Sequence, residues 1–91
     1  MPMNNNIHDA IMAERERQHD KWTKHHTWGH GDCSSDDVEA AVKAAVLSEE
    51  CGEVARAVLD GCNHESLYCE LVQVAAVAVA WLECLENHSQ P

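Results

Sequence analysis

The sequence predicts an all-α fold built from three helices. Alanine, valine, leucine and glutamate are abundant among the 91 residues, a composition that favours helix. Four glycines, two prolines and no phenylalanine are poor material for the turns and aromatic positions of a β-sandwich. Helical periodicity appears in three segments, residues 5–22, 36–60 and 64–87. A chain of this length is expected to form a single domain, residues 1–91.

The first helix, residues 5–22, carries Ile7, Ile11, Gln18 and Trp22 at helical spacing, with charged residues between them. The segment that follows, residues 23–35, is rich in histidine, glycine, threonine and serine. It is longer than most connections between helices, and loops of this length are often functional or mobile. The sequence therefore indicates a long loop after the first helix.

The second helix is expected to begin near Asp36, because Asp36 and Glu39 fit the capping-box pattern. Gly61 marks its end, since glycine is the usual residue just past a helix C-terminus. Asn63 and the residues after it open the third helix. The short connection predicts that the second and third helices are two long antiparallel acidic helices.

The third helix is apolar nearly all round between residues 71 and 82. A helix of this kind must be covered on more than one side, and so short a chain supplies few partners. We therefore expect a homo-oligomer, a dimeric or tetrameric helical bundle in which the third helices lie at the centre.

The charge balance excludes several classes of partner. Six basic residues against sixteen acidic ones give a net charge of −10, so a broad face for nucleic acid or for an anionic membrane is not expected. The longest apolar run, residues 74–82, is too short to span a bilayer. Five cysteines without a signal-peptide pattern indicate reduced thiols in the cytoplasm.

Carboxylates interrupt the apolar stripes of the second and third helices. The stripe of Val42 and Val46 also holds three acids, Glu49, Glu50 and Glu53. On the third helix Glu70 lies on the apolar stripe and Gln73 flanks it. An acidic pair on a helix is usually just solvated, but uncompensated burial is costly and this chain has few cations. Facing pairs of oxygen ligands therefore predict a Mg²⁺ site.

These segments resemble the MazG-like family of all-α nucleoside triphosphate pyrophosphohydrolases. The family signature is E-E-x-x-E followed by E-x-x-D, and it is matched by residues 47–54, LSEECGEV, and 70–73, ELVQ. Residues 14–22, ERERQHDKW, are similar to the first helix of small phage and bacterial members, and so are residues 75–82, AAVAVAWL. The resemblance covers nearly the whole chain.

The resemblance implies a homodimer or a dimer of dimers that binds Mg²⁺, with Mn²⁺ as a substitute. It implies cleavage of a nucleoside triphosphate to a monophosphate and pyrophosphate, and a role in cleansing nucleotide pools. By matching position, Glu50, Glu53 and Glu70 would be metal ligands together with Gln73. Glu49 would be a further ligand or would orient the attacking water, so that Glu49 and Glu50 are the catalytic candidates.

Gln73 departs from the family pattern, which has Asp at this position. An amide oxygen can coordinate Mg²⁺ but brings no charge, so metal affinity and metal number are in question. The alternative function is a catalytically weakened or inactive homo-oligomer that binds nucleotide or metal.

Substrate contacts are expected from the first helix. We assign them to Arg15, Gln18, Lys21 and Trp22. Arg17 and Lys24 are further cations that could meet phosphates, although any one of them is more simply an exposed charge. Trp22 or Trp28 would stack on a base or serve only in packing.

A competing metal site lies in the long loop. His26, His30 and Cys33 have a spacing that could hold Zn²⁺. A second pair of ligands at ordinary spacing is missing, and histidine-rich loops are often simply polar. His30, beside two glycines, could instead contact substrate.

Overall fold

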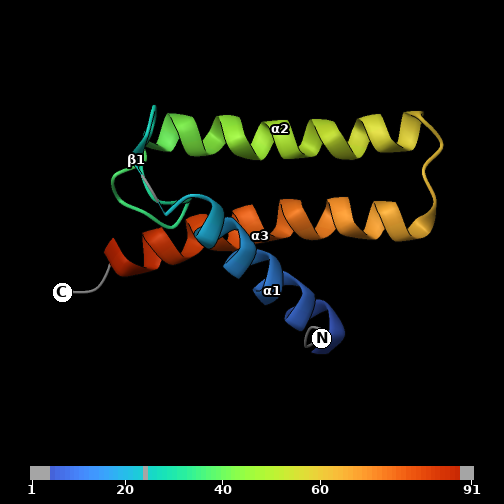
Figure 1. Ribbon diagram of the computed structural model, residues 1–91, viewed down its shortest axis with the longest axis horizontal. Coiled ribbons are helices and arrows are strands. Elements are labelled where there is room, and N and C mark those ends of the chain that lie inside the picture. Colours follow the sequence, from blue (N-terminus) through green and yellow to red (C-terminus); the bar gives the residue numbers. More distant parts are fainter. Residues whose placement is uncertain (1–4, 24, 89–91) are drawn as a thin grey trace.

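Three helices form most of the structure, a computed structural model that describes residues 5–23 and 25–88. They are α1 (Asn5–Lys21), α2 (Ala40–Leu59) and α3 (His64–His88), and two very short strands, β1 (His25–His26) and β2 (Gly29–His30), lie between α1 and α2. The predicted all-α fold of three packed helices is confirmed (Figure 1).

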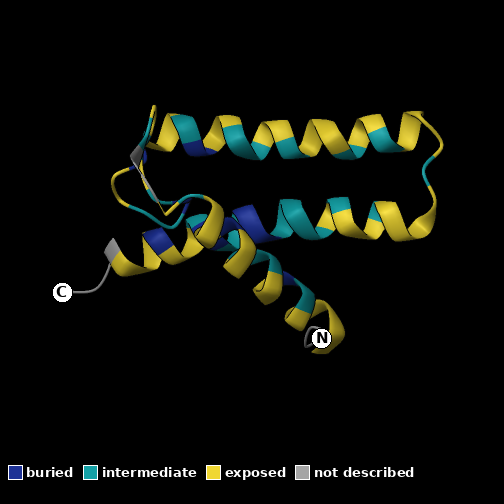
Figure 2. Cartoon of the chain, viewed as in Figure 1, coloured by how far each residue is buried: buried dark blue, intermediate teal, exposed yellow. Residues whose placement is uncertain are grey.

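The helix α3 is the central element, because it packs against both α1 and α2. Figure 1 shows α3 running back alongside α2, while α1 crosses α3 obliquely. The most deeply buried residues of α3 are Ala76, Val77, Ala80 and Cys84, which lie toward its C-terminal end. In Figure 2 the part of α3 nearest the turn to α2 is largely exposed or half-buried. The core of this chain therefore lies at the end of the molecule where the long loop folds.

The turn between α2 and α3 is closed by backbone and side-chain caps. Gly61 has a φ of 76°, which glycine adopts without strain. The amide of Cys62 donates to the carbonyl oxygen of Ala57, which is the long hydrogen bond of a Schellman motif. The side chain of Asn63 accepts a hydrogen bond from the amide of Ser66 and caps α3. Both helix ends therefore lie where the sequence predicted them.

The start of α2 differs from the prediction. The helix begins at Ala40 with Glu39 as its N-cap residue, and the Glu39 side chain makes no capping hydrogen bond. Ser35 explains the delay, because its hydroxyl donates to the carbonyl oxygen of His30 and accepts from the amide of Asp37. Local bonds of this kind compete with helix formation. The capping box predicted at Asp36 is therefore wrong.

The long loop contains a small antiparallel hairpin that the sequence analysis missed. β1 and β2 pair His25 with His30 and His26 with Gly29. Gly29 has a φ of 130°, and a Cβ atom there would lie 2.6 Å from the backbone oxygen of Asp37. A glycine is required at this position because the hairpin packs directly on the chain that leads into α2.

A partly buried arginine anchors the loop to α1 and α3. Arg15 on α1 donates one hydrogen bond to Asp32 in the loop at 3.2 Å, and another to Glu83 on α3 at 2.7 Å. The Asp32 side chain is only 4% exposed. Burial alone would raise the pKa of Asp32, but hydrogen bonds from Ser34 and the charge of Arg15 outweigh it and hold that pKa below its ordinary value.

The length and apolar composition of α3 resemble those of a membrane-spanning helix. Among the described residues, the stretch His64–Asn87 is long and apolar enough to cross a membrane by length and composition. The central helix of a soluble protein can meet the same criterion, and 22% of the apolar part of this stretch is buried in the described structure.

Asp32→Asn should destabilise the fold by about 3 kcal/mol, because it removes the buried charge of Asp32 and leaves the partly buried Arg15 guanidinium short of one negative partner. Glu83→Gln is the control: the Glu83 side chain is 47% exposed, so its loss should cost about 1 kcal/mol or less. Urea unfolding at neutral pH measures both variants. Equal small losses would show that the Arg15–Asp32 contact does not anchor the loop.

Candidate metal centre and the cavity beside it

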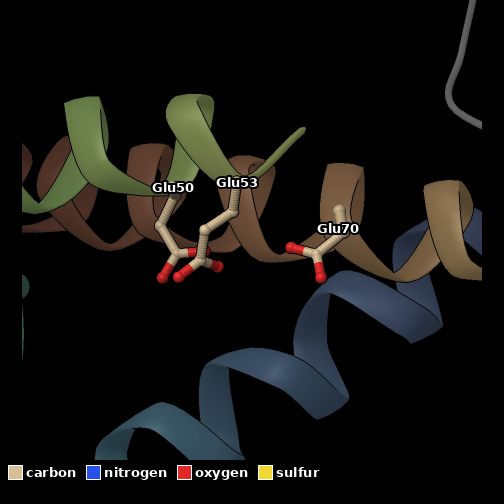
Figure 3. Close-up of side chains that lie close together, drawn as sticks. All are labelled: Glu50, Glu53 and Glu70. Carbon is tan, nitrogen blue, oxygen red and sulfur yellow. The ribbon is translucent and has the colours of Figure 1, made fainter. Parts of the chain in front are cut away.

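Three carboxylates from two helices converge on one point. Glu50 and Glu53 stand one helical turn apart on α2, and Glu70 faces them from α3 (Figure 3). Each offers an oxygen atom within 4.8 Å of the others. This set, the acidic triad, is the one group of clustered metal-type ligands found among residues 5–23 and 25–88.

The electrostatics of the acidic triad are unfavourable without a cation. Burial raises the pKa of Glu50 to about 7, and the negative charges of Glu53, Glu70 and Glu49 add to the effect. One oxygen of Glu50 and one of Glu70 are buried, and neither has a hydrogen-bond partner within the described part of the chain. Buried polar atoms are rarely left in this state unless an ion or water completes them. Three clustered carboxylates, two of them with an unsatisfied buried oxygen, fit a hard divalent cation such as Mg²⁺.

The other two predicted members of the metal site lie next to the acidic triad. Glu49 is exposed and does not belong to the cluster. It lines a neighbouring cavity together with Glu50. Gln73 is half-buried on α3, one turn beyond Glu70. The structure thus brings together three of the predicted ligands and places Glu49 at the cavity wall.

A cavity of about 470 Å³ opens beside Glu50, between α1, the loop and α2. This volume lies within the range of small-molecule sites. Its floor on α2 is apolar apart from the two glutamates, and its opposite wall carries aromatic and cationic side chains. The residues of α1 and the loop that line the cavity are Arg17, Gln18, Lys21, Trp22, His26, Trp28, Gly31, Asp32 and Cys33.

The aromatic residues of this wall contact one another. Trp22 and His26 meet edge to face, with 5.0 Å between ring centroids, and Trp28 lies 6.1 Å from His26. The Lys21 ammonium sits 5.4 Å from the centre of the Trp22 ring. These contacts hold two indole rings at the cavity, where a flat aromatic ligand could pack against either.

The first-helix residues predicted to bind substrate do not all reach this cavity. Gln18, Lys21 and Trp22 line it. Arg15 is not among the lining residues, because its guanidinium is bound to Asp32 and Glu83. Arg15 is therefore a structural anchor, and its assignment to substrate is not supported. Lys24 lies outside the described residues.

Arg17 occupies the cavity wall instead. Two hydrogen bonds, of 2.8 and 2.6 Å, join its guanidinium to the carboxylate of Glu14. Glu14 also accepts from the amide of Gln18 at 3.1 Å. The hydrogen bonds from Arg17 hold the pKa of Glu14 below its ordinary value. Glu14 is not among the predicted site residues, although its spacing from Arg17 on a helix is a signal visible in the sequence.

The alternative zinc site in the loop is not supported. The His26 Nε2 atom lies 2.9 Å from the carbonyl oxygen of Gly31, to which it donates, and Nδ1 accepts from the amide of Trp28. Both ring nitrogens are therefore used, and neither lone pair is open to a metal. Cys33 is buried against Val77 and Ala80 of α3. The loop histidine and cysteine serve packing and turn formation here.

Comparison with known proteins gives no relative for this chain: no family model, curated protein or solved structure matches it.

Glu50→Gln should stabilise the metal-free protein by about 1 kcal/mol at pH 8, since water screens part of the repulsion at this half-buried site. Folding raises the pKa of Glu50 to about 7. Between about pH 4.5 and 7 the native state therefore keeps a proton on this carboxyl that the unfolded state has lost. Stability of the parent should therefore fall as pH rises from about 4.5 through 7.

Chemical unfolding with a chelator present, repeated across this pH range, measures the effect. The matched control is Glu65→Gln, which removes an exposed carboxylate at the start of α3, away from the acidic triad. If the stability of the parent changed between pH 5 and 8 in the same way as the stability of Glu50→Gln, the acidic triad would carry no strain.

Proposed function

We propose that this protein is a Mg²⁺-dependent nucleoside triphosphate pyrophosphohydrolase. It would cleave its substrate between the α- and β-phosphates and release pyrophosphate and a nucleoside monophosphate. The observation that carries the proposal is the position of Glu50, which belongs to the acidic triad and also lines the cavity with aromatic and cationic walls. The resemblance of residues 47–54 and 70–73 to the MazG-like signature supports the same reaction, and with it a role in cleansing nucleotide pools.

Glu50, Glu53 and Glu70 would hold the ion, and Mn²⁺ would substitute for Mg²⁺. The bound cation would screen the triphosphate and stabilise the charge on the leaving pyrophosphate. The unpartnered oxygens of Glu50 and Glu70 are the atoms that would gain most from coordination. Gln73, one turn from Glu70 on the same helix, would add a neutral oxygen ligand.

Glu49 has the position of a general base. It is exposed at the cavity wall beside Glu50 and stands outside the acidic triad, so its carboxylate is free to accept a proton from water. In the proposed reaction Glu49 orients a water molecule and takes its proton while the oxygen attacks the α-phosphorus. Glu50 would keep the water and the ion together.

The opposite wall would bind the nucleotide. Arg17 and Lys21 would contact the phosphates, and Trp22 or Trp28 would stack on the base. Glu14 fixes the guanidinium of Arg17 through two hydrogen bonds before any ligand arrives, which lowers the entropy lost on binding. Gln18, held by the same carboxylate, is the neutral polar group at this wall.

A second candidate function is nucleotide binding without hydrolysis. It is favoured by Gln73, which replaces a charged ligand of the family signature by an amide. A panel of nucleoside triphosphates with Mg²⁺, assayed for pyrophosphate release, separates the two functions. Saturable nucleotide binding with no pyrophosphate release from any member of the panel would favour the second.

Glu53→Gln and Glu70→Gln should each reduce Mg²⁺-dependent pyrophosphate release at least 100-fold, about 3 kcal/mol of transition-state stabilisation. Each variant removes one charged ligand and keeps the shape of the side chain, so the fold should be as stable as the parent or more so. Glu65→Gln is the control for a lost charge on α3. Parental rates in both site variants would refute the assignment of the acidic triad.

Gln73→Asp should strengthen Mg²⁺ binding and raise turnover if the chain is a weakened enzyme, because a charged ligand attracts a hard cation more strongly than an amide. The gain should be modest, since aspartate is one methylene shorter. Titration of Mg²⁺ against both proteins measures it, with pyrophosphate release as the readout. Unchanged Mg²⁺ affinity would place position 73 outside the coordination shell.

We also propose a cytoplasmic homo-oligomer, a dimer or a dimer of dimers, with no nucleic-acid or membrane partner. All five cysteines are free, as expected for a reducing compartment. The radius of gyration is 13.9 Å, whereas a compact chain of this length should have about 12 Å. Leu71, Leu82 and Leu85 on α3 are each at least half exposed. A second copy of the chain would cover these apolar side chains and pair the helices into a bundle.

Sedimentation velocity at micromolar concentration should therefore give a dimer or larger species, and Leu82→Glu should shift it toward monomer. Leu59→Glu is the control, because Leu59 is 80% exposed at the end of α2, away from the apolar face of α3. A folded parent monomer at this concentration would contradict the proposed assembly.

A further inference from the structure

A buried lysine and a buried cysteine form a pair that the proposed reaction does not use. Lys43 on α2 and Cys84 on α3 are each 3% exposed. The ammonium group of Lys43 donates to the Cys84 sulfur, with 3.0 Å between Nζ and Sγ. Neither residue lines the cavity or belongs to the acidic triad. The pair lies at the opposite end of α2 from the turn, beside the long loop.

Lys43 has unusual surroundings for a buried cation. No ion pair of Lys43 with a carboxylate is present among the described residues, although a buried ammonium group normally needs one. The Cys84 thiol in turn donates to Asp36 at 3.3 Å. Asp36 is exposed, so the pair lies directly beneath the surface of the loop. A second buried thiol, Cys33, is close enough for both Lys43 and Cys84 to influence its pKa.

We propose that Lys43 and Cys84 form an oxidative modification site, at which a single oxygen atom joins the lysine nitrogen to the cysteine sulfur. The 3.0 Å between nitrogen and sulfur leaves room for one bridging atom and for little more. A direct bond between the two atoms would require α2 and α3 to move closer together. The helices α2 and α3 are already packed together, so a covalent link between them requires little distortion.

Hydrogen peroxide is the oxidant in this step, and two molecules are consumed. The first converts the Cys84 thiol to a sulfenic acid and leaves as water. The Lys43 ammonium then loses a proton to solvent. The second peroxide breaks its O–O bond and takes one hydrogen from the lysine nitrogen and one from the sulfenic hydroxyl. An O–N bond forms, two water molecules leave, and sulfur and nitrogen have been oxidised.

The link would tie α2 to α3 at the base of the loop that shapes the cavity. The two residues are 41 positions apart, so a covalent bridge would restrict the unfolded chain and stabilise the native state. The bridge contains weak S–O and O–N bonds, and a thiol reductant such as dithiothreitol would return the free lysine and cysteine.

The experiment treats the reduced full-length protein with hydrogen peroxide, digests it, and analyses the peptides by mass spectrometry. The expected product contains the Lys43 and Cys84 peptides joined, with the mass of one added oxygen atom and two lost hydrogen atoms. It should disappear after dithiothreitol, and the oxidised protein should have a higher Tm than the reduced one. Double replacement of the exposed thiols, Cys51→Ser and Cys69→Ser, should leave the linked product unchanged.

Lys43→Arg keeps the positive charge but lacks the primary amine, so its Cys84 should proceed to the sulfinic acid instead of forming a link. Peptide mapping of the parent decides the question even where this variant does not fold. A disulfide between Cys33 and Cys84, or a parent with Cys84 oxidised and Lys43 unmodified, would overturn the proposal.

Discussion

Mutual repulsion among three carboxylates is the constraint on which the rest of this structure depends. Glu50 and Glu70 are half-buried and Glu53 is exposed, and their oxygen atoms lie within 4.8 Å of one another. The pKa of Glu50 is raised to about 7 by burial and by the neighbouring charges. A helix pair that tolerates such a cluster is stabilised elsewhere and gains when a cation binds.

The stabilisation comes from the other end of the molecule. The buried part of α3 packs there against α1 and the loop, and the Arg15–Asp32–Glu83 ion pairs join all three segments. The same contacts hold the hairpin of residues 25–30 in place, with Trp28 and His26 at the cavity wall. One arginine thereby links the stability of the fold to the shape of the proposed binding site, without itself reaching the cavity.

The helices and the acidic triad could be predicted because both leave a periodic signal. The apolar stripe of α2 and α3 has a helical period, and glutamates that interrupt it are visible in the sequence alone. The hairpin leaves no such signal, since its strands have two residues each. The ion pairs of Arg15 could not be predicted from the sequence, because its partners lie 17 and 68 positions away. Lys43 resembles an ordinary surface lysine until the packing of α3 and the loop buries it.

The most direct test of the acidic triad as a metal site is an NMR titration of the protein with Mn²⁺, whose unpaired electrons broaden the signals of nearby nuclei. The account predicts that the side-chain carboxyl signals of Glu50, Glu53 and Glu70 broaden first, and that an excess of Mg²⁺ restores them. Broadening that begins at other carboxylates, or that Mg²⁺ does not reverse, would contradict the central claim.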